Sequence, residues 1–196
     1  DMLNALGRPP VALETARGWI GNGARRLVER ALTQDFDGEA PAQLMETAYP
    51  LFQKCYQANL HRDSVLYAGV DETLAQCQAA GRLVGCVTNK PAAFTLPLLK
   101  AMGLSRYLDP IVSGDDLPKK KPDPLPLEHV VEQWGLPPAQ CLLVGDSVSD
   151  FRAARACGMP VVLVSYGYSQ GLDLFELGPD AVIDSLAKVL NIIDAV

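Results

Sequence analysis

The chain has 196 residues, of which 48% are hydrophobic, and a formal net charge of −6. This length and apolar content suffice for one or two compact domains with a buried core. The negative charge argues against sequence-independent binding to nucleic acid or anionic lipid, because both need a basic surface. No apolar run approaches the roughly 18 residues of a membrane helix, and no signal-peptide pattern opens the chain. We therefore expect a cytoplasmic protein that binds neither nucleic acid nor membrane.

The first 62 residues contain helical patterns only. Residues 24–32 and 42–58 place apolar side chains at three- and four-residue spacing with polar faces between them, which is typical of amphipathic helices. No strand candidate interrupts them. We place a domain boundary near residues 60–68 and assign residues 1–66 to a helical domain.

From about residue 66 onwards, the pattern alternates between helices and short apolar strands. The expected helices cover residues 70–80, 92–102, 124–134, 150–156 and 186–193, and the expected strands cover residues 83–87, 111–112, 141–144 and 161–164. Gly81, Gly103, Gly135 and Gly158 each follow a helix and precede the next strand or apolar run. This alternation predicts an α/β fold with a parallel, doubly wound Rossmann-like sheet in residues 67–196.

Polar side chains follow several of these strands. The apolar run 141–144 ends at Gly145, and two carboxylates, Asp146 and Asp150, follow it. Ligands of open α/β sheets lie beyond the carboxyl ends of the strands, and Mg²⁺ prefers a few carboxylates together with water and substrate oxygens. The pair is a candidate magnesium site, although a helix N-cap also explains an Asp or Ser at such a position.

Two further segments carry candidate phosphate ligands. Thr88 and Asn89 follow the strand at 83–87, where a hydroxyl and backbone N–H groups at a helix N-terminus favour an anion; a simple Thr or Asn cap is the alternative. Lys121 precedes Pro122, and this rigid support would present its ammonium group in a fixed position. We expect Lys119 and Lys120 to be solvated.

In this order along the chain, these segments resemble the haloacid dehalogenase superfamily of phosphatases. The segments Trp19–Ala24, Val87–Pro91, Gly114–Asp116 and Lys120–Pro122 are similar to its phosphoglycolate phosphatase branch. The resemblance implies that Thr88, the Asn89 backbone and Lys121 hold the phosphoryl group, with Thr88 and Lys121 acting in catalysis. It also implies that Asp146 and Asp150 hold Mg²⁺, and that the fold is a Rossmann-like core with a helical cap.

The first motif of that superfamily, Asp-x-Asp-Gly-Thr after an apolar strand, has no counterpart in the chain. The segment Asp35–Gly38 imitates it, but Asp35 follows a helical pattern and Glu39 occupies the position of the Thr. We do not assign the nucleophile to it. The resemblance implies that the nucleophile loop, and with it the central strand of the sheet, lies upstream of Asp1.

The segment Gly21-Asn22-Gly23 resembles the cap loop that closes over the substrate in that branch. It would exclude water, with Arg25 or Arg26 near a substrate carboxylate, because guanidinium groups bind carboxylates bidentately. A flexible turn before a helix and two solvated arginines are the alternative interpretation, and we assign neither arginine a role.

The resulting hypothesis is a Mg²⁺-dependent phosphomonoesterase that acts on a small acidic phosphate ester such as 2-phosphoglycolate. The resemblance implies an aspartyl-phosphate intermediate. A non-catalytic phosphate-binding or interaction module of the same fold is the alternative, because the nucleophile motif is not found. The oligomeric state is not readable from the sequence.

Overall fold

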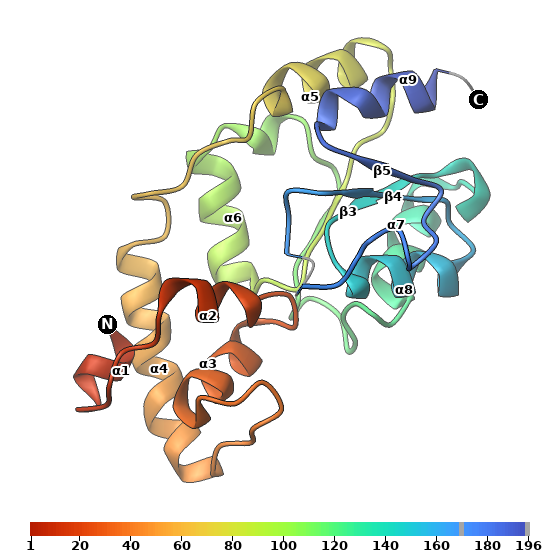
Figure 1. Cartoon of the computed structure of the whole chain (residues 1–196). Helices are drawn as coiled ribbons and strands as arrows, with labels where there is room; N and C mark the ends of the chain where they lie inside the picture. Colours follow the sequence, from red (N-terminus) through yellow and green to blue (C-terminus); the bar gives the residue numbers. More distant parts are fainter. Residues whose placement is uncertain (169–170, 195–196) are drawn as a thin grey trace.

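The computed structural model describes residues 1–168 and 171–194. Helices of the N-terminal third form one part of the molecule, and the strands with their flanking helices form the other (Figure 1). We call residues 1–66 the helical region and residues 67–194 the α/β region. No helix or strand occurs in the segment that joins α4 (Ala42–Ala58) to α5 (Val70–Ala79).

The helical region has its own apolar core. It consists of α1 (Met2–Ala5), α2 (Leu13–Gly18), α3 (Ala24–Thr33) and α4. The periodic apolar positions of α3 and α4 face each other and α1, and the buried residues are Met2, Val28, Leu32, Met45 and Ala48. Helices α3 and α4 lie where the periodicity predicted them, whereas α1 and α2 were not predicted individually.

The α/β region alternates helices and strands. Its elements are α5, β1 (Cys86–Val87), α6 (Ala92–Ala101), β2 (Ile111–Val112), α7 (Leu125–Trp134), β3 (Leu143–Gly145), α8 (Val148–Cys157), β4 (Val161–Val164), β5 (Ala181–Ile183) and α9 (Val189–Ile193), with short 3₁₀ turns at Leu104–Arg106, Pro138–Gln140 and Leu186–Lys188. Helices α7 and α8 end at Gly135 (φ 65°) and Gly158 (φ 74°). Glycine adopts these left-handed conformations without a steric penalty.

All strand pairs in the described part of the chain are parallel, and they form two separate ladders. β1 pairs with β2, with Cys86 opposite Ile111. The second ladder has the order β3-β4-β5, with Leu143 opposite Val161. Within the described residues, no backbone pairing joins β1 to β3.

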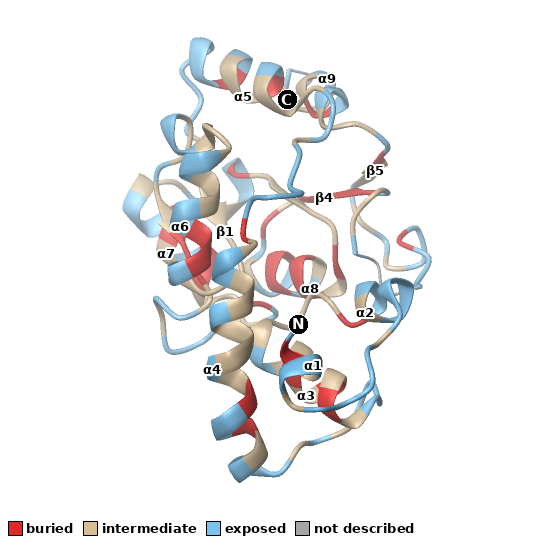
Figure 2. Ribbon diagram, turned by 90° about the vertical axis from the view of Figure 1, so that its left-hand side faces the viewer, coloured by how far each residue is buried: buried red, intermediate tan, exposed pale blue. Residues whose placement is uncertain are grey.

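The central strand of the second ladder shows why the fold has helices on both faces. All four residues of β4 are buried (Figure 2), and alternate side chains point to opposite faces of a sheet. Val161 and Leu163 pack with residues of α7 and α8, while Val162 and Val164 pack with β5 and α9. A strand buried on both faces reads as a continuous apolar run, and this run was predicted correctly.

The predicted fold class is confirmed, with corrections to individual elements. The strand expected at residues 83–87 is limited to β1, because Leu83 is 57% exposed and does not join the core. The strand expected at 141–144 covers Leu143–Gly145 instead, and α8 begins two residues earlier than expected, at Val148. The strand β5 was not predicted. None of the described helices has the length and apolar character needed to cross a bilayer.

Candidate active site

The five residues proposed as ligands line one cavity. Its volume is about 360 Å³, and it lies between the carboxyl ends of β1 and β3 and the loop that precedes α3. The α/β region contributes Thr88, Asn89, Lys121, Asp146 and Asp150 to its wall. Residues more than 60 positions apart in the sequence thus meet at one end of the sheet, as the rule for ligand sites of parallel sheets predicts.

Lys121 and Asp150 form a buried ion pair in this wall. The ammonium group lies 2.6 Å from Asp150 Oδ1, and the two side chains are 10% and 6% exposed. The ammonium also donates to the carbonyl of Val87, at 2.5 Å. A buried ion pair is costly to break, because the partner that is left behind keeps its charge without compensation. Lys121 is therefore held in place, in contrast to its exposed neighbours Lys119 and Lys120.

The second oxygen of Asp150 organises the loop after β3. Asp150 Oδ2 accepts hydrogen bonds from the backbone N–H groups of Asp146 (3.1 Å) and Ser147 (3.0 Å) and from the Ser147 hydroxyl (2.6 Å). Ser147 and Asp150 form a capping box at the start of α8. Burial alone would raise the pKa of Asp150, but the charge of Lys121 and these hydrogen bonds outweigh it and lower the pKa. Asp150 is an ionised group that orients its neighbours.

Asp146 has a different environment. Burial, followed by the charge of Asp150, raises the pKa of Asp146 above its usual value. Its Oδ2 accepts a hydrogen bond from the Tyr168 backbone N–H at 3.1 Å, while Oδ1 has no hydrogen-bond partner in the described part of the chain. Gly167 packs so closely that a Cβ atom there would lie 2.1 Å from Asp146 Cβ. The carboxylate is fixed in position with one oxygen available to a ligand.

The donor set around Asp146 fits a hard cation only in part. Residues 1–168 and 171–194 contain no cluster of three or more His, Cys, Asp or Glu side chains arranged to hold a metal. Mg²⁺ is often bound through one or two carboxylates, with water and substrate phosphate completing its shell. Asp146 can supply such a carboxylate, whereas both oxygens of Asp150 already have partners.

Thr88 and Asn89 connect the segments of the site. The Thr88 hydroxyl accepts a hydrogen bond from the Lys90 N–H at 3.1 Å, so it caps its own turn while its proton stays free to be donated. The Asn89 side chain donates to the carbonyls of Lys121 (2.9 Å) and Gly21 (3.2 Å). The sequence predicted a role for the backbone of Asn89 only. In the structure, the side chain of Asn89 links the segments of Thr88 and Lys121 to the helical region.

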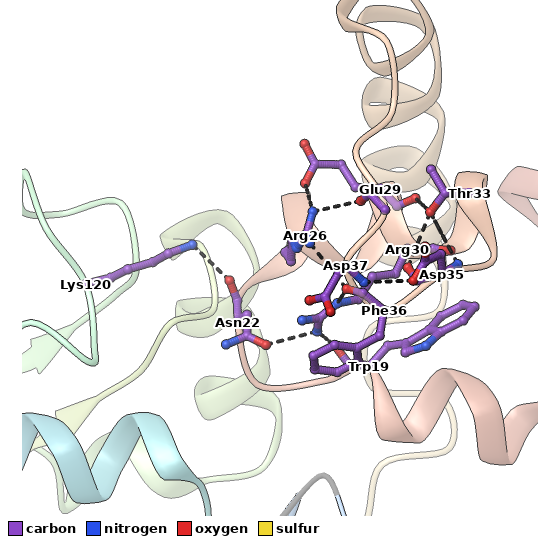
Figure 3. Close-up of polar contacts among 11 residues, drawn as sticks. Trp19, Asn22, Arg26, Glu29, Arg30, Thr33, Asp35, Phe36, Asp37 and Lys120 are labelled. Carbon is purple, nitrogen blue, oxygen red and sulfur yellow. Dashed lines mark hydrogen bonds and ion pairs between the residues drawn. The ribbon is translucent and has the colours of Figure 1, made fainter.

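The helical region closes the cavity with a loop, residues 19–23. Arg30, which is only 3% exposed, donates to the carbonyl of Trp19 (2.6 Å) and to Asn22 Oδ1 (2.9 Å), as Figure 3 shows. From the other side, Lys120 donates to the Asn22 carbonyl at 3.0 Å. This loop places Ile20, among others, in the cavity wall. The loop is thus fastened to both regions, and this observation argues against a flexible turn.

The arginines near this loop do not reach the cavity. Arg26 donates to the carbonyls of Gly38 (2.8 Å) and Phe36 (3.3 Å) and pairs with Glu29 at 3.1 Å (Figure 3). Arg25 is exposed. Both line a separate hollow, which is formed by charged side chains of the helical region together with Lys120, so neither is placed to meet a ligand in the main cavity.

The Asp35–Gly38 segment also lies away from the cavity. Asp35 Oδ1 accepts the Asp37 N–H at 3.0 Å within an exposed turn, and the ring of Phe36 lies 3.7 Å from the guanidinium carbon of Arg30. Neither carboxylate lines the main cavity. The segment is a structural turn after α3.

Three residues at or beside the cavity had no role assigned from the sequence and bear on the site. Lys90 and Tyr56 line the cavity and contact each other, and Gly167 packs against Asp146. The residue type of Lys90 was visible next to Thr88 and Asn89. The contact of Lys90 with Tyr56 on α4 and the contact of Gly167 with Asp146 join residues that are far apart in the sequence, so local spacing does not predict them.

The parallel sheet with helices on both faces, and its polar site at the strand ends, define a Rossmann-like α/β protein with a helical region over the site. Residues 2–164 match the family described as haloacid dehalogenase-like hydrolase, and the chain belongs to this family. The resemblance found in the sequence is thereby confirmed.

Individual relatives carry more specific names than the family does. The chain is 48% identical over 192 residues to a phosphoglycolate phosphatase of Nitrosospira multiformis, which covers 98% of the chain and 85% of the relative. It is 48% identical over 187 residues to one of Thiobacillus denitrificans, with coverages of 95% and 82%. Among solved structures, a predicted phosphoglycolate phosphatase from Haemophilus somnus superposes with a TM-score of 0.89 at 34% identity, over 97% of this chain and 86% of the other.

Proposed function

We propose that the protein is a phosphatase that hydrolyses a small acidic phosphate monoester, with 2-phosphoglycolate as the substrate. The observation that carries this proposal is the convergence of Thr88, Asn89, Lys121 and Asp146 on one cavity. Phosphoryl transfer depends on positioning and on stabilising charge at the phosphoryl oxygens rather than on elaborate covalent chemistry by the protein. The names of relatives that are 44–48% identical support the same reaction and substrate.

Each group has a role in this proposal. Lys121, oriented by Asp150, binds phosphoryl oxygens and stabilises the charge on them. The Thr88 hydroxyl donates its free proton to another phosphoryl oxygen. The hydrogen bonds of the Asn89 side chain hold the Thr88 and Lys121 segments and the loop of residues 19–23 in fixed positions relative to one another.

For the metal, we propose Mg²⁺ with Asp146 as the direct ligand from this chain and Asp150 as a supporting carboxylate. When bound, the ion would offset the negative charge of the phosphoryl group. Asp146→Asn should weaken Mg²⁺ binding in calorimetry. An affinity unchanged by this substitution would contradict the assignment.

The attacking group in this proposal is an aspartate encoded upstream of Asp1, which forms an aspartyl phosphate that water hydrolyses. The residues of the cavity described above include no aspartate besides Asp146 and Asp150, and these are assigned to the metal and to Lys121. We use the term parent protein for this chain together with the residues encoded upstream of it.

The test compares the parent protein with the 196-residue chain. Both are assayed with 2-phosphoglycolate and Mg²⁺, and only the parent protein is expected to turn over. Binding of phosphate without turnover by either form would favour the non-catalytic phosphate-binding module instead. Turnover by the shorter chain would show that its own residues supply the nucleophile.

A further inference from the structure

The cavity contains one cation that the proposed chemistry does not use. Its charged lining residues in the described part of the chain are Lys90, Lys121, Asp146 and Asp150. Lys121 is paired with Asp150, and Asp146 is proposed to hold the metal. The ion pairs of the described residues do not include Lys90. The positive charge of Lys90 is therefore without a carboxylate partner at this site.

Hydrogen bonds hold both the backbone and the side chain of Lys90 in place. Its N–H donates to the Thr88 hydroxyl, and its carbonyl accepts from the Gly114 N–H (2.9 Å) and the Thr95 hydroxyl (3.0 Å). At the other end, its ammonium donates to the hydroxyl of Tyr56 on α4. The side chain thus bridges the α/β region and the helical region across the cavity.

The surroundings of this ammonium are largely apolar. The Tyr56 ring packs against Phe52 and Phe94, with ring centroids 5.4 Å and 4.9 Å apart, and Leu27 lines the same cavity. An ammonium group has three N–H donors, of which one is used by Tyr56 in the described part. Interactions of a charge with an anion are stronger where apolar walls displace water.

The Tyr56 hydroxyl extends the site. It accepts a hydrogen bond from Lys90 and keeps its own proton for donation. The pair therefore presents N–H and O–H donors together, a combination that matches the two oxygens of a carboxylate. Among residues 1–168 and 171–194, no arginine lines this cavity.

We propose that Lys90, with the hydroxyl of Tyr56, binds the carboxylate of the substrate and so selects acidic phosphate esters over neutral ones. This inference rests on the proposed function, since the phosphoryl group must occupy the end of the cavity formed by Thr88 and Lys121. It assigns specificity to a residue of the α/β region that reaches α4 of the helical region.

The test compares two esters of similar size on the parent protein with Mg²⁺: 2-phosphoglycolate, which carries a carboxylate, and 2-hydroxyethyl phosphate, which carries a hydroxyl group instead. Lys90→Met should lower kcat/KM for 2-phosphoglycolate by roughly ten- to a hundredfold, because a charge-assisted hydrogen bond is lost. Most of the loss should appear in KM. The loss for 2-hydroxyethyl phosphate should be smaller by about tenfold or more.

Three further variants test whether the effect is specific to Lys90 and Tyr56. Lys90→Arg should restore a large part of the preference for 2-phosphoglycolate, and Tyr56→Phe should reduce that preference less than Lys90→Met does. Lys100→Met, an exposed change of the same kind on α6, should leave both substrates unaffected.

The inference is overturned if Lys90→Met lowers kcat/KM equally for both esters, or for neither. Equal hydrolysis of the two esters by the unmodified parent protein would also overturn it while leaving the phosphatase in place. If the parent protein hydrolyses neither ester, the proposed function fails, and this inference fails with it.

Discussion

The two regions of the molecule use their charged side chains in different ways. In the α/β region, several charged side chains line the cavity: Lys121 and Asp150 pair within its wall, and Asp146 keeps one oxygen available. In the helical region, the buried Arg30 binds the carbonyl groups of Trp19 and Phe36 and so holds loops together. The α/β region thus carries the proposed reactive groups, and the helical region carries a loop that lies over the cavity.

The two regions therefore contribute differently to the site: the α/β region supplies the proposed reactive groups, and the helical region supplies part of the cavity wall. Groups at the ends of parallel strands converge because the strands run in the same direction. The helical region contributes mainly backbone and apolar surface, with Ile20, Leu27 and Phe52 in the cavity wall, together with the hydroxyl of Tyr56. Changes in the α/β region should therefore remove activity, whereas changes in the helical region should affect closure and substrate choice. The following substitutions test that contrast, from the largest expected effect to the smallest.

Removing Asp150 should have the largest effect. Asp150→Ala leaves the ammonium of Lys121 buried without its partner, and such a loss typically costs about 3–5 kcal/mol in the free energy of unfolding. Urea unfolding followed by circular dichroism measures this cost. Asp63→Ala removes the partner of the exposed Arg62 and serves as the control, with little expected change. Similar stabilities for the two variants would show that the buried pair has no special role.

Removing Lys121 should abolish most of the activity of the parent protein. Loss of a group that stabilises charge in the transition state typically lowers kcat on the order of a hundredfold or more. Lys119→Ala, at an exposed position two residues earlier, should leave kcat nearly unchanged. Comparable small losses of kcat in both variants would show that Lys121 contributes no more to catalysis than the exposed Lys119.

Removing Arg30 tests the helical region. Arg30→Met loses hydrogen bonds from a charged donor to two carbonyl groups and to Asn22, and we expect a destabilisation of about 1.5–3 kcal/mol. Because the freed loop lines the cavity, KM should rise more than kcat falls. Arg25→Met, at an exposed site, is the matched control. A fall in kcat with an unchanged KM would contradict the division between the regions.

The smallest effect is expected at the start of α8. Ser147→Ala removes the capping hydroxyl and should lower the free energy of unfolding by about 1 kcal/mol. Ser185 occupies the corresponding position of a 3₁₀ turn without a side-chain cap, so Ser185→Ala should have almost no effect. Equal melting curves for both variants would argue against a stabilising capping box.

The sequence predicted the parts of the fold that depend on local patterns. The apolar runs before Asp146 and Thr88 identified strand ends, and the periodicity of α3 and α4 identified helices. β5 was missed because three apolar residues after Asp180 give too weak a signal for a strand. Leu83 was wrongly included in a strand because its exposure depends on tertiary packing.

The candidate site was predictable to a similar degree. Thr88, Lys121 and Asp146 follow local signals, and they do line one cavity. The contact between Lys90 and Tyr56 joins residues 34 positions apart, and Gly167 meets Asp146 from a different strand end. Such contacts arise only when distant segments of the chain pack together, so a single sequence does not reveal them.

The proposed function places all catalytic groups in the α/β region or in the upstream segment of the parent protein, and none in the helical region. The most direct test is kcat of the parent protein and of its Asp35→Asn, Asp37→Asn double variant on 2-phosphoglycolate with Mg²⁺. Both aspartates lie in an exposed turn, so kcat should stay within about twofold. Loss of turnover in the double variant would place the nucleophile in the helical region and contradict the account.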